Sequence, residues 1–403
     1  MSKIKIIDSI MGSGKTESII NKINNSNKDE NFIYITPYLD ECNRIKNSCK
    51  HKYFIEPDEV KMGTKTRHFK NLASKGYNIV STHSLFKGAD EELLEILNAQ
   101  NYTLILDEVL DVVEPLKISK KDLKEILERY AHVDKDTNEL VWDDLEYFGN
   151  HIEIKNMATN GSLIVINGVI LLWNFPVEIF KAFKEVYLLT YLFDYQIQKY
   201  YYDYYGIEFE KYSLDRIDNK SIIVEYGKSK FEKDKICSIE KLVNIYEGRL
   251  NNIGDSDTSL SKSWFEKNKD SVIINSLKKN IYTYFKTNTK TKSMVNGWTT
   301  FKEYESLLSG DGYTRGFIPL NMRASNKYNH KKSLAYVTNR YMNPFVKQMF
   351  INKGVDVNEK LWALSEMLQW LWRGTIRVDE KMEVYIPSKR MREMLREWLS
   401  PNN

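Results

Sequence analysis

A glycine-rich segment near the N-terminus has the residues of a phosphate-binding loop. Residues 9–16 read Ser-Ile-Met-Gly-Ser-Gly-Lys-Thr, between an apolar run at 4–7 and a helix-compatible run. Glycines let backbone N–H groups close around a phosphate, the lysine can reach the outer phosphate oxygens, and the threonine hydroxyl can bind magnesium. Ser9 stands where glycine is usual, a position that tolerates a small residue. We predict that Gly12, Ser13, Gly14, Lys15, Thr16 and Glu17 bind ATP, with Thr16 also on Mg²⁺; the alternative is a glycine turn without nucleotide.

Two adjacent carboxylates end another apolar run. Residues 104–108 read Leu-Ile-Leu-Asp-Glu. At the end of a strand, Asp107 would hold magnesium through water, and Glu108 would polarise the attacking water, as ATP hydrolysis requires. An Asp-Glu pair can also be a helix cap. Its position downstream of a phosphate-binding loop favours the catalytic interpretation.

The elements that must position these residues follow a βα pattern. Short apolar runs alternate with helical stretches in the first third of the chain, at 4–7, 32–35, 79–80 and 104–106. Such alternation predicts a parallel sheet with helices on both faces and a ligand at the carboxyl ends of the strands. A further strand is expected at 186–189, after an insert from about 117 to 184 in which Asn167-Gly168 forms a hairpin turn.

Length and composition limit the class of protein. The 403 residues fit two domains, each able to bury its own core. No apolar run approaches the roughly 18 residues of a membrane span. The N-terminus carries lysines and leads directly into the first strand, so we expect no cleavable signal and a cytoplasmic location, that of the bacterial host if the gene is phage-encoded. Three cysteines without a Cys-x-x-Cys pair argue against a disulfide framework and against a zinc site.

Further blocks occur in the order found in superfamily-two helicases of the DEAD-like group, which the chain resembles over almost its whole length. Asp107 and Glu108 occupy the DEAD position. The resemblance implies that the blocks at 36–39 and 81–85 contact the sugar-phosphate backbone, and that the block at 189–192 couples hydrolysis to movement. The residues implied are Thr36, Pro37, Arg44, Thr82 and His83 for nucleic acid, and Thr190 for coupling.

A block near the C-terminus is similar to the family's motif VI, in which a glutamine and two arginines face the nucleotide from the second lobe. It places Gln369, Arg373 and Arg377 at i, i+4 and i+8, which on a helix would form one stripe. Trp372 stands where glycine is usual, and Arg377 comes one residue late. The alternative is an amphipathic helix whose arginines lie over neighbouring tryptophans.

A basic segment lies between residues 271 and 355, with fourteen Lys and Arg against three Asp and Glu. Aromatic residues are interleaved with these bases. Lysines that neutralise phosphates, alternating with rings on which bases stack, are a known way to hold single strands. The alternative is a solvated lysine face over core aromatics. We predict nucleic-acid contacts from Lys278, Lys279 and Lys286, and, at the place of the family's motif V, from Arg323 and Asn339.

The resemblance implies an α/β fold of two RecA-like P-loop lobes, parallel sheets flanked by helices, with insertions in both. We place the lobes at 1–195 and 196–403, with further strands at 221–225, 334–337 and 383–386. The chain would be an ATP- and Mg²⁺-dependent helicase or translocase on DNA or RNA, with single-stranded or forked DNA favoured. The order and the Tyr- and Lys-rich texture resemble phage and viral enzymes, including the origin-binding type.

Three other interpretations stay open. A packaging-type motor with a nuclease would need clustered carboxylates for two metals, and the basic segment is nearly free of acids. A nucleoside kinase shares the loop sequence but is about half as long and carries zinc-binding cysteine pairs. An ATP-gated DNA-binding regulator that never translocates fits the same motifs, and a strand-displacement assay beside an ATPase assay separates it from a helicase.

Overall fold

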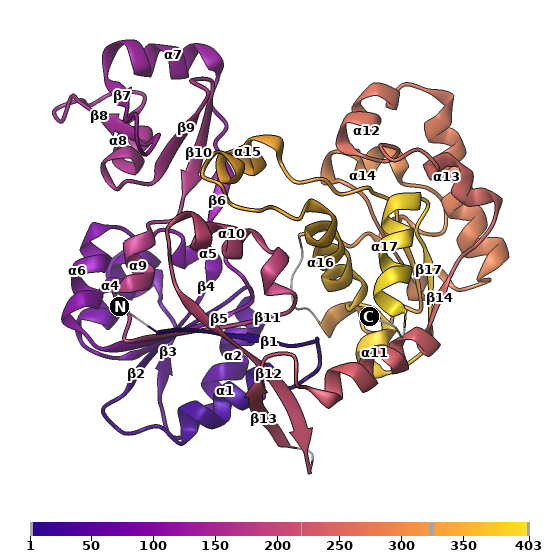
Figure 1. The fold of residues 1–403 in the computed structure, drawn as a ribbon, viewed down its shortest axis with the longest axis horizontal. Helices are drawn as coiled ribbons and strands as arrows, with labels where there is room; N and C mark the ends of the chain where they lie inside the picture. The colour runs from indigo at the N-terminus through magenta and orange to yellow at the C-terminus, as the bar shows by residue number, and fades with distance from the viewer. Residues whose placement is uncertain (1–2, 219, 322–325, 401–403) are drawn as a thin grey trace. The chain divides into compact units, whose positions relative to one another are not determined.

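The computed structural model describes residues 3–218, 220–321 and 326–400. The chain divides into two compact units (Figure 1). Unit 1 comprises Met1–Ile10, Gly14–Lys228 and Asn343–Val357, and unit 2 comprises Met11–Ser13, Ser229–Met342 and Asn358–Asn403. Among the described residues, no helix combines the length and the apolar character that crossing a membrane requires.

Unit 1 is built on an eight-stranded sheet in the order β13-β12-β1-β11-β5-β2-β4-β3, in which every pair except β12 with β13 is parallel. The strands are β1 (Lys3–Asp8), β2 (Asn31–Thr36), β3 (Phe54–Ile55), β4 (Asn78–Thr82), β5 (Tyr102–Asp107), β11 (Glu185–Thr190), β12 (Phe209–Ile217) and β13 (Lys220–Glu225). The predicted parallel sheet is confirmed, and it is wider than the sequence indicated.

Helices cover both faces of this sheet because the strand residues alternate and both sets are apolar. Ile7, Tyr34 and Ile105 pack with α1 and α2. The helices of unit 1 outside the insert are α1 (Lys15–Asn24), α2 (Leu39–Ser48), α3 (Glu59–Met62), α4 (Lys65–Ser74), α5 (His83–Phe86), α6 (Glu91–Ala99), α9 (Val177–Lys181), α10 (Ile197–Tyr204) and α15 (Pro344–Asn352). α5 begins directly after β4 ends, so the carboxyl end of this strand leads straight into a helix.

The insert between β5 and β11 has a core of its own, around Leu123, Trp142 and Leu163. Its elements are β6 (Val113–Pro115), α7 (Lys120–Arg129), β7 (Ala131–Val133), β8 (Leu140–Trp142), α8 (Ile152–Thr159), β9 (Leu163–Ile166) and β10 (Ile170–Asn174). β9 and β10 pair antiparallel across a turn in which Asn167 and Gly168 both have positive φ. The predicted hairpin is confirmed.

Unit 2 contains a four-stranded parallel sheet in the order β14-β17-β16-β15. Its core includes Trp298, Tyr284 and Tyr385, all buried. The elements are α11 (Lys230–Leu242), β14 (Val243–Ile245), α12 (Lys262–Asn268), α13 (Val272–Thr283), a π-helical turn (Tyr284–Asn288), β15 (Asn296–Thr299), α14 (Glu305–Leu308), β16 (Ser333–Tyr336), α16 (Glu359–Leu371), β17 (Met382–Tyr385) and α17 (Lys389–Leu399). The strands expected near 334–337 and 383–386 are β16 and β17.

The boundary between the units differs from the one placed at 195/196. α10, β12 and β13 belong to unit 1, because β12 pairs with β1 over four residues, Phe209 to Tyr212, and β13 extends the same sheet. The strand expected at 221–225 is therefore β13 of the first sheet. α15 also belongs to unit 1, where the Phe350 ring packs 5.9 Å from the Tyr200 ring. These pairings join residues far apart in sequence, so local patterns gave no sign of them.

Candidate active site

The glycine-rich loop connects β1 to α1. Gly12 and Gly14 have φ of 82° and 92°, in the left-handed region that favours glycine. A side chain at Gly14 would also collide with the Ser221 hydroxyl of β13. The Lys15 ammonium folds over the loop and donates to the carbonyl oxygens of Ser9 at 2.5 Å and Ile10 at 3.3 Å. The Lys15 ammonium therefore lies beside the N-terminal turn of α1. A positive side chain next to a helix N-terminus is typical of an anion-binding site.

The two carboxylates follow β5. Asp107 is buried, and the Tyr34 hydroxyl of the neighbouring strand donates to its carboxylate at 3.2 Å. Burial, together with the charges of Glu108 and Glu41, raises the pKa of Asp107 to about 7, while the Lys15 charge acts in the opposite direction. Because the Lys15 charge acts to lower the pKa of Asp107, the glycine-rich loop and this carboxylate interact electrostatically. A cation bound there would favour the ionised form of Asp107.

β11 lies between β1 and β5 and ties the two loops together. The carbonyl oxygen of Thr190 accepts from the Ser9 N–H at 3.0 Å, and that of Leu189 accepts from the Glu108 N–H at 2.9 Å. Glu108 has φ of 72°, a left-handed conformation that is uncommon outside glycine and is often found at functional sites. The Thr190 hydroxyl, predicted to couple hydrolysis to movement, is buried and donates to Gln196 at 2.9 Å. Consecutive backbone carbonyls of one strand therefore set the relative position of both motifs.

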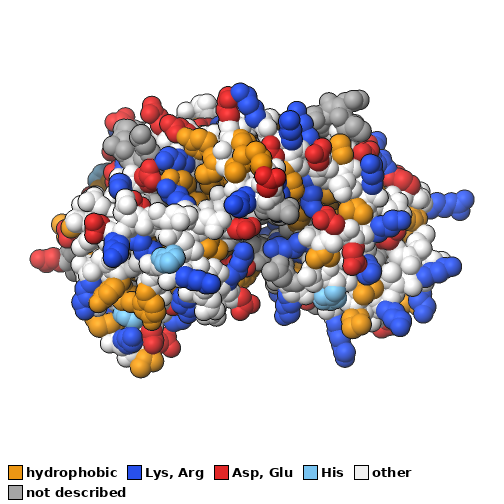
Figure 2. Space-filling view, turned by 90° about the horizontal axis from the view of Figure 1, so that it is seen from below, with side chains coloured by type: hydrophobic (Ala, Val, Ile, Leu, Met, Phe, Trp, Pro, Cys, Tyr) orange, Lys and Arg blue, Asp and Glu red, His pale blue; other side chains and the backbone are white. Residues whose placement is uncertain are grey.

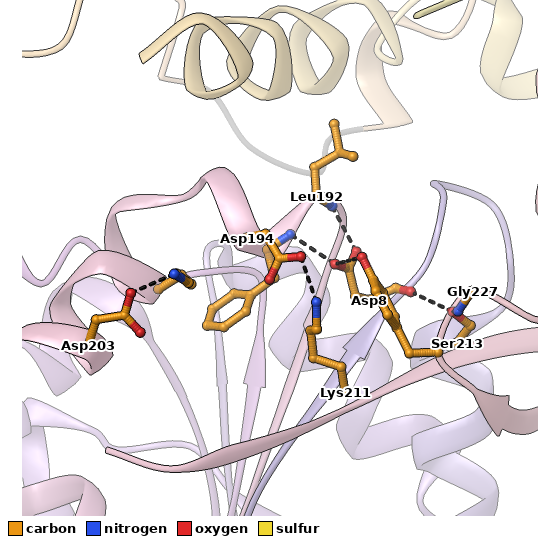
Figure 3. A network of polar contacts seen from close by, with 10 residues as sticks. Asp8, Leu192, Asp194, Asp203, Lys211, Ser213 and Gly227 are labelled. Atoms are coloured by element: carbon orange, nitrogen blue, oxygen red, sulfur yellow. Dashed lines mark hydrogen bonds and ion pairs between the residues drawn. The ribbon is translucent and has the colours of Figure 1, made fainter. Parts of the chain in front are cut away.

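Asp8, which the sequence analysis did not single out, organises the carboxyl edge beside the loop (Figure 3). Its buried carboxylate accepts from the backbone N–H groups of Leu192 at 2.8 Å and Phe193 at 3.0 Å. These residues follow β11, and Leu192 has φ of 58°. Beside them, Lys211 of β12 donates to Asp194 at 2.6 Å. The signal in the sequence that could have identified Asp8 is its position as a polar residue at the end of an apolar strand, directly before the glycine-rich loop.

The β12–β13 hairpin explains why serine replaces the usual first glycine. The Ser9 hydroxyl is buried and accepts from the Leu214 N–H of β12 at 2.6 Å. Ser213 donates weakly to the Asp8 carbonyl at 3.4 Å and accepts from the Gly227 N–H at 3.2 Å. The loop is thus held from β12 as well as from β11.

The residues of unit 1 predicted to contact nucleic acid lie at carboxyl ends of strands, with different surroundings. Thr36 ends β2 and is fully buried, and Pro37 after it is half-buried. Thr82 caps α5, accepting from the Leu85 N–H at 3.5 Å. His83 is buried, with Nε2 3.1 Å from the Asp107 carbonyl oxygen, so it contacts the end of β5. Arg44 is exposed and pairs with Glu41 at 3.1 Å.

The predicted helical stripe of Gln369, Arg373 and Arg377 is wrong. α16 ends at Leu371, and Arg377 lies in a 3₁₀ turn (Thr375–Val378). The helix stops where Gly374 passes so close to β16 and β17 that a side chain would meet neighbouring atoms at 2.7–3.0 Å. Gln369 is half-buried on the helix. Arg373 is 2% exposed and donates to the carbonyl oxygens of Pro319 at 3.1 Å and Leu320 at 3.4 Å.

The predicted nucleic-acid contacts of unit 2 separate into distinct environments. Asn339 is fully buried. Its amide donates to the carbonyl oxygens of Asp257 and Ser259 and accepts from Arg390, so its hydrogen bonds are made inside unit 2 and not at an exposed surface. Arg323 lies outside the described residues. Lys279 and Lys286 are exposed, and Lys278 is half-buried on α13.

Comparison with known proteins gives the relationship. A protein of Bacillus subtilis (strain 168), described as "SPbeta prophage-derived uncharacterized protein YonV", is 46% identical over 411 residues, covering 99% of each chain. This chain belongs to the YonV family. Residues 113–173 match the YonV middle domain and contain the elements of the insert from β6 through most of β10. Residues 237–399 match the YonV C-terminal Rossmann-like domain, and all of them except Asn343–Val357 belong to unit 2.

A solved structure shares the fold of this YonV-family chain. The structure described as "XPD_APO" aligns with a TM-score of 0.50 at 12% identity, covering 98% of this chain and 95% of that one. The structure of S. tokodaii Xpd4 aligns with a TM-score of 0.49, also at 12% identity, over 98% and 94% of the two chains. The fold is α/β with two RecA-like lobes. At this identity the likeness concerns the fold alone.

Proposed function

We propose that this YonV-family protein is an ATP-driven motor that acts on nucleic acid, a helicase or translocase. The observation that carries the proposal is the pair of hydrogen bonds to backbone carbonyls of β11, which holds the glycine-rich loop after β1 and the Asp107-Glu108 pair after β5 on either side of one strand end. A cation at Lys15, a helix N-terminus and two carboxylates then share one site, the arrangement that phosphoryl transfer to water requires.

The residues present fit ATP and Mg²⁺. Gly12, Gly14 and Lys15 form a cradle for phosphates, and the buried Asp107, with its raised pKa, is a carboxylate that a cation would stabilise. Thr16 and Asp107 would hold the magnesium ion, which when bound neutralises charge on the phosphates. The loop backbone would orient the nucleotide.

Glu108 would act as the general base. Its backbone is fixed by the hydrogen bond to Leu189, and its left-handed conformation turns the chain sharply after β5. A carboxylate at this turn would accept a proton from an attacking water. The nearby Lys15 ammonium would stabilise negative charge that develops on the transferred phosphoryl group.

Nucleic acid is the proposed substrate because the other predicted blocks also end strands of this sheet. Thr36, Pro37 and Thr82 lie along the carboxyl edge next to the proposed ATP site. Single-stranded or forked DNA is favoured and RNA is the alternative. The prophage origin of the relative supports a role in phage replication or recombination in the cytoplasm of the bacterial host. The resemblance to origin-binding enzymes stays a prediction.

The test is MgATP hydrolysis by the full chain with and without single-stranded DNA, RNA or duplex, beside a strand-displacement assay. We expect hydrolysis that one of the nucleic acids stimulates, together with displacement of a paired strand. Stimulated hydrolysis without displacement or translocation would instead support an ATP-gated DNA-binding regulator. Absence of magnesium-dependent hydrolysis under all conditions would refute the proposed function.

A further inference from the structure

We propose that a basic pocket at the amino-terminal edge of the unit 2 sheet is a second binding site for single-stranded nucleic acid. It is separate from the carboxyl edges of the two sheets and includes Lys286, one of the lysines that the sequence predicts to contact nucleic acid. Its ligand class rests on the proposed function. The pocket has a volume of about 590 Å³, within the range of roughly 300–1,000 Å³ of ligand sites. Tyr282, Lys286, Lys290, Lys292 and Asn296 are among the residues that line it.

The position of the pocket follows from β15. Asn296 is the first residue of that strand and lines the pocket, whereas Thr299 is the last. From the first to the fourth residue a strand rises by about 10 Å, at roughly 3.3 Å per step, so the pocket and the carboxyl edge lie at opposite ends of β15. In open α/β sheets the usual ligand crevice is at the carboxyl edge. The pocket is therefore an additional feature.

The charge of the pocket is unbalanced. Lys286, Lys290 and Lys292 are exposed at its wall, and within the described residues no carboxylate forms an ion pair with any of them. Asp311 also lines the pocket, so three cations face one acid. Figure 2, a view from below Figure 1, shows Lys and Arg side chains on the face that it draws.

Other lysines of the same unit are already paired with carboxylates. Lys262 pairs with Glu303, Lys302 with Glu305, and Lys332 with Glu380 at 3.1 Å. These three are exposed to a similar degree, so the contrast does not come from burial. The charge of the pocket lysines is therefore available to a polyanion.

The backbone beneath the lysines is irregular and held in place. A π-helical turn (Tyr284–Asn288) interrupts the end of α13, and the Thr289 N–H donates to the Tyr284 carbonyl at 3.0 Å. Lys290 has φ of 53°, and the Thr291 hydroxyl donates to Asn296 at 2.7 Å. π-turns and left-handed non-glycine residues recur at functional sites. Here they bring Lys286, Lys290 and Lys292 to one wall.

An exposed aromatic ring favours nucleic acid, which has bases that can stack on it, over a polyanion without bases. Tyr282 lines the pocket and is 44% exposed, although most aromatic residues of the surrounding core are buried. A ring beside lysines binds a single strand by stacking one base while the cations neutralise phosphates. An acidic protein segment would use the lysines without needing the ring.

The test is fluorescence anisotropy of a labelled oligothymidylate on the full chain, titrated at several salt concentrations. The pocket variant is Lys286→Gln, Lys290→Gln and Lys292→Gln together. The matched control removes the same charge at Lys262, Lys302 and Lys332. Each lost phosphate contact lowers the salt slope by about 0.7 for single strands, so we expect a slope lower by about 2 in the pocket variant and unchanged in the control.

Tyr282 supplies an independent readout. Tyr282→Ala should weaken binding about fivefold or more at every salt concentration, with an unchanged slope, because stacking is not a counterion effect. Tyr282→Phe keeps the ring and should restore affinity. Both variants should retain the melting temperature and the hydrolysis rate measured without nucleic acid.

The outcomes separate this proposal from the proposed function. If the salt dependence of binding falls equally in the pocket and control variants, or falls in neither, the pocket is not a nucleic-acid site. Hydrolysis that nucleic acid still stimulates would in that case leave the proposed motor function supported. A polyglutamate probe that competes fully with the oligonucleotide, with no effect of Tyr282→Ala, would overturn the proposal in favour of an acidic protein partner. Loss of all hydrolysis in the unmodified protein would refute the proposed function itself.

Discussion

Arg373→Ala is expected to lower the stability of unit 2, whatever it does to turnover. Sequence alone offered two roles for this arginine, a contact with the transferred phosphate or packing over tryptophans. In the structure its guanidinium is 2% exposed and donates to the carbonyls of Pro319 and Leu320. Alanine would leave both part-buried carbonyls without this donor.

The magnitude follows from these contacts. A hydrogen bond from a charged group contributes about 1.5–3 kcal/mol, and the longer of the two, at 3.4 Å, contributes less than the one at 3.1 Å. Together with the lost packing of the side chain, we expect a loss of about 2–4 kcal/mol in the free energy of unfolding. For a unit of this size the melting temperature should fall by roughly 5–15 °C.

The assay is calorimetric unfolding of the full chain, with nucleic-acid-stimulated turnover measured on the same samples below the transition. Arg377→Ala is the comparison, because Arg377 is half-buried in a 3₁₀ turn and should cost less stability. A melting temperature within about 2 °C of the unmodified protein would refute the structural role of Arg373. If turnover nevertheless fell by about a thousandfold, the predicted arginine finger would be supported instead.

The remaining predictions concern unit 1. Lys15→Ala should abolish ATP hydrolysis while the melting temperature stays within a few degrees, because Lys15 is the half-buried first residue of α1 and alanine is compatible with a helix; calorimetry and phosphate release check this, and wild-type turnover would remove Lys15 from the site. Glu108→Gln should bind ATP and stall, since an amide cannot accept the proton; normal single-turnover hydrolysis would place the base elsewhere. Asp8→Asn should destabilise the protein by about 1.5–3 kcal/mol, because the amide cannot reproduce both charge-assisted acceptors for Leu192 and Phe193; urea unfolding measures it, and an unchanged midpoint would contradict the role of Asp8.

The sequence by itself determined the local motifs. The strand, glycine-rich loop and helix around Lys15 are contiguous, so their residue types and spacing predict their conformation directly. The same holds for the apolar strand that ends at Asp107 and for the hairpin turn at Asn167-Gly168. In each case the interactions that fix the structure are made within a few residues.

Only the tertiary structure decided which strands are neighbours and which side chains meet. β12 pairs with β1 across about two hundred residues, so nothing local to residues 209–217 assigns them to the first sheet. The contact of Tyr34 with Asp107 and the burial of Asn339 are likewise set by packing between distant segments. α16 ends before Arg373 because Gly374 must pass close to β16 and β17. This contact is tertiary, so the helical spacing of residues 369, 373 and 377 does not reveal it.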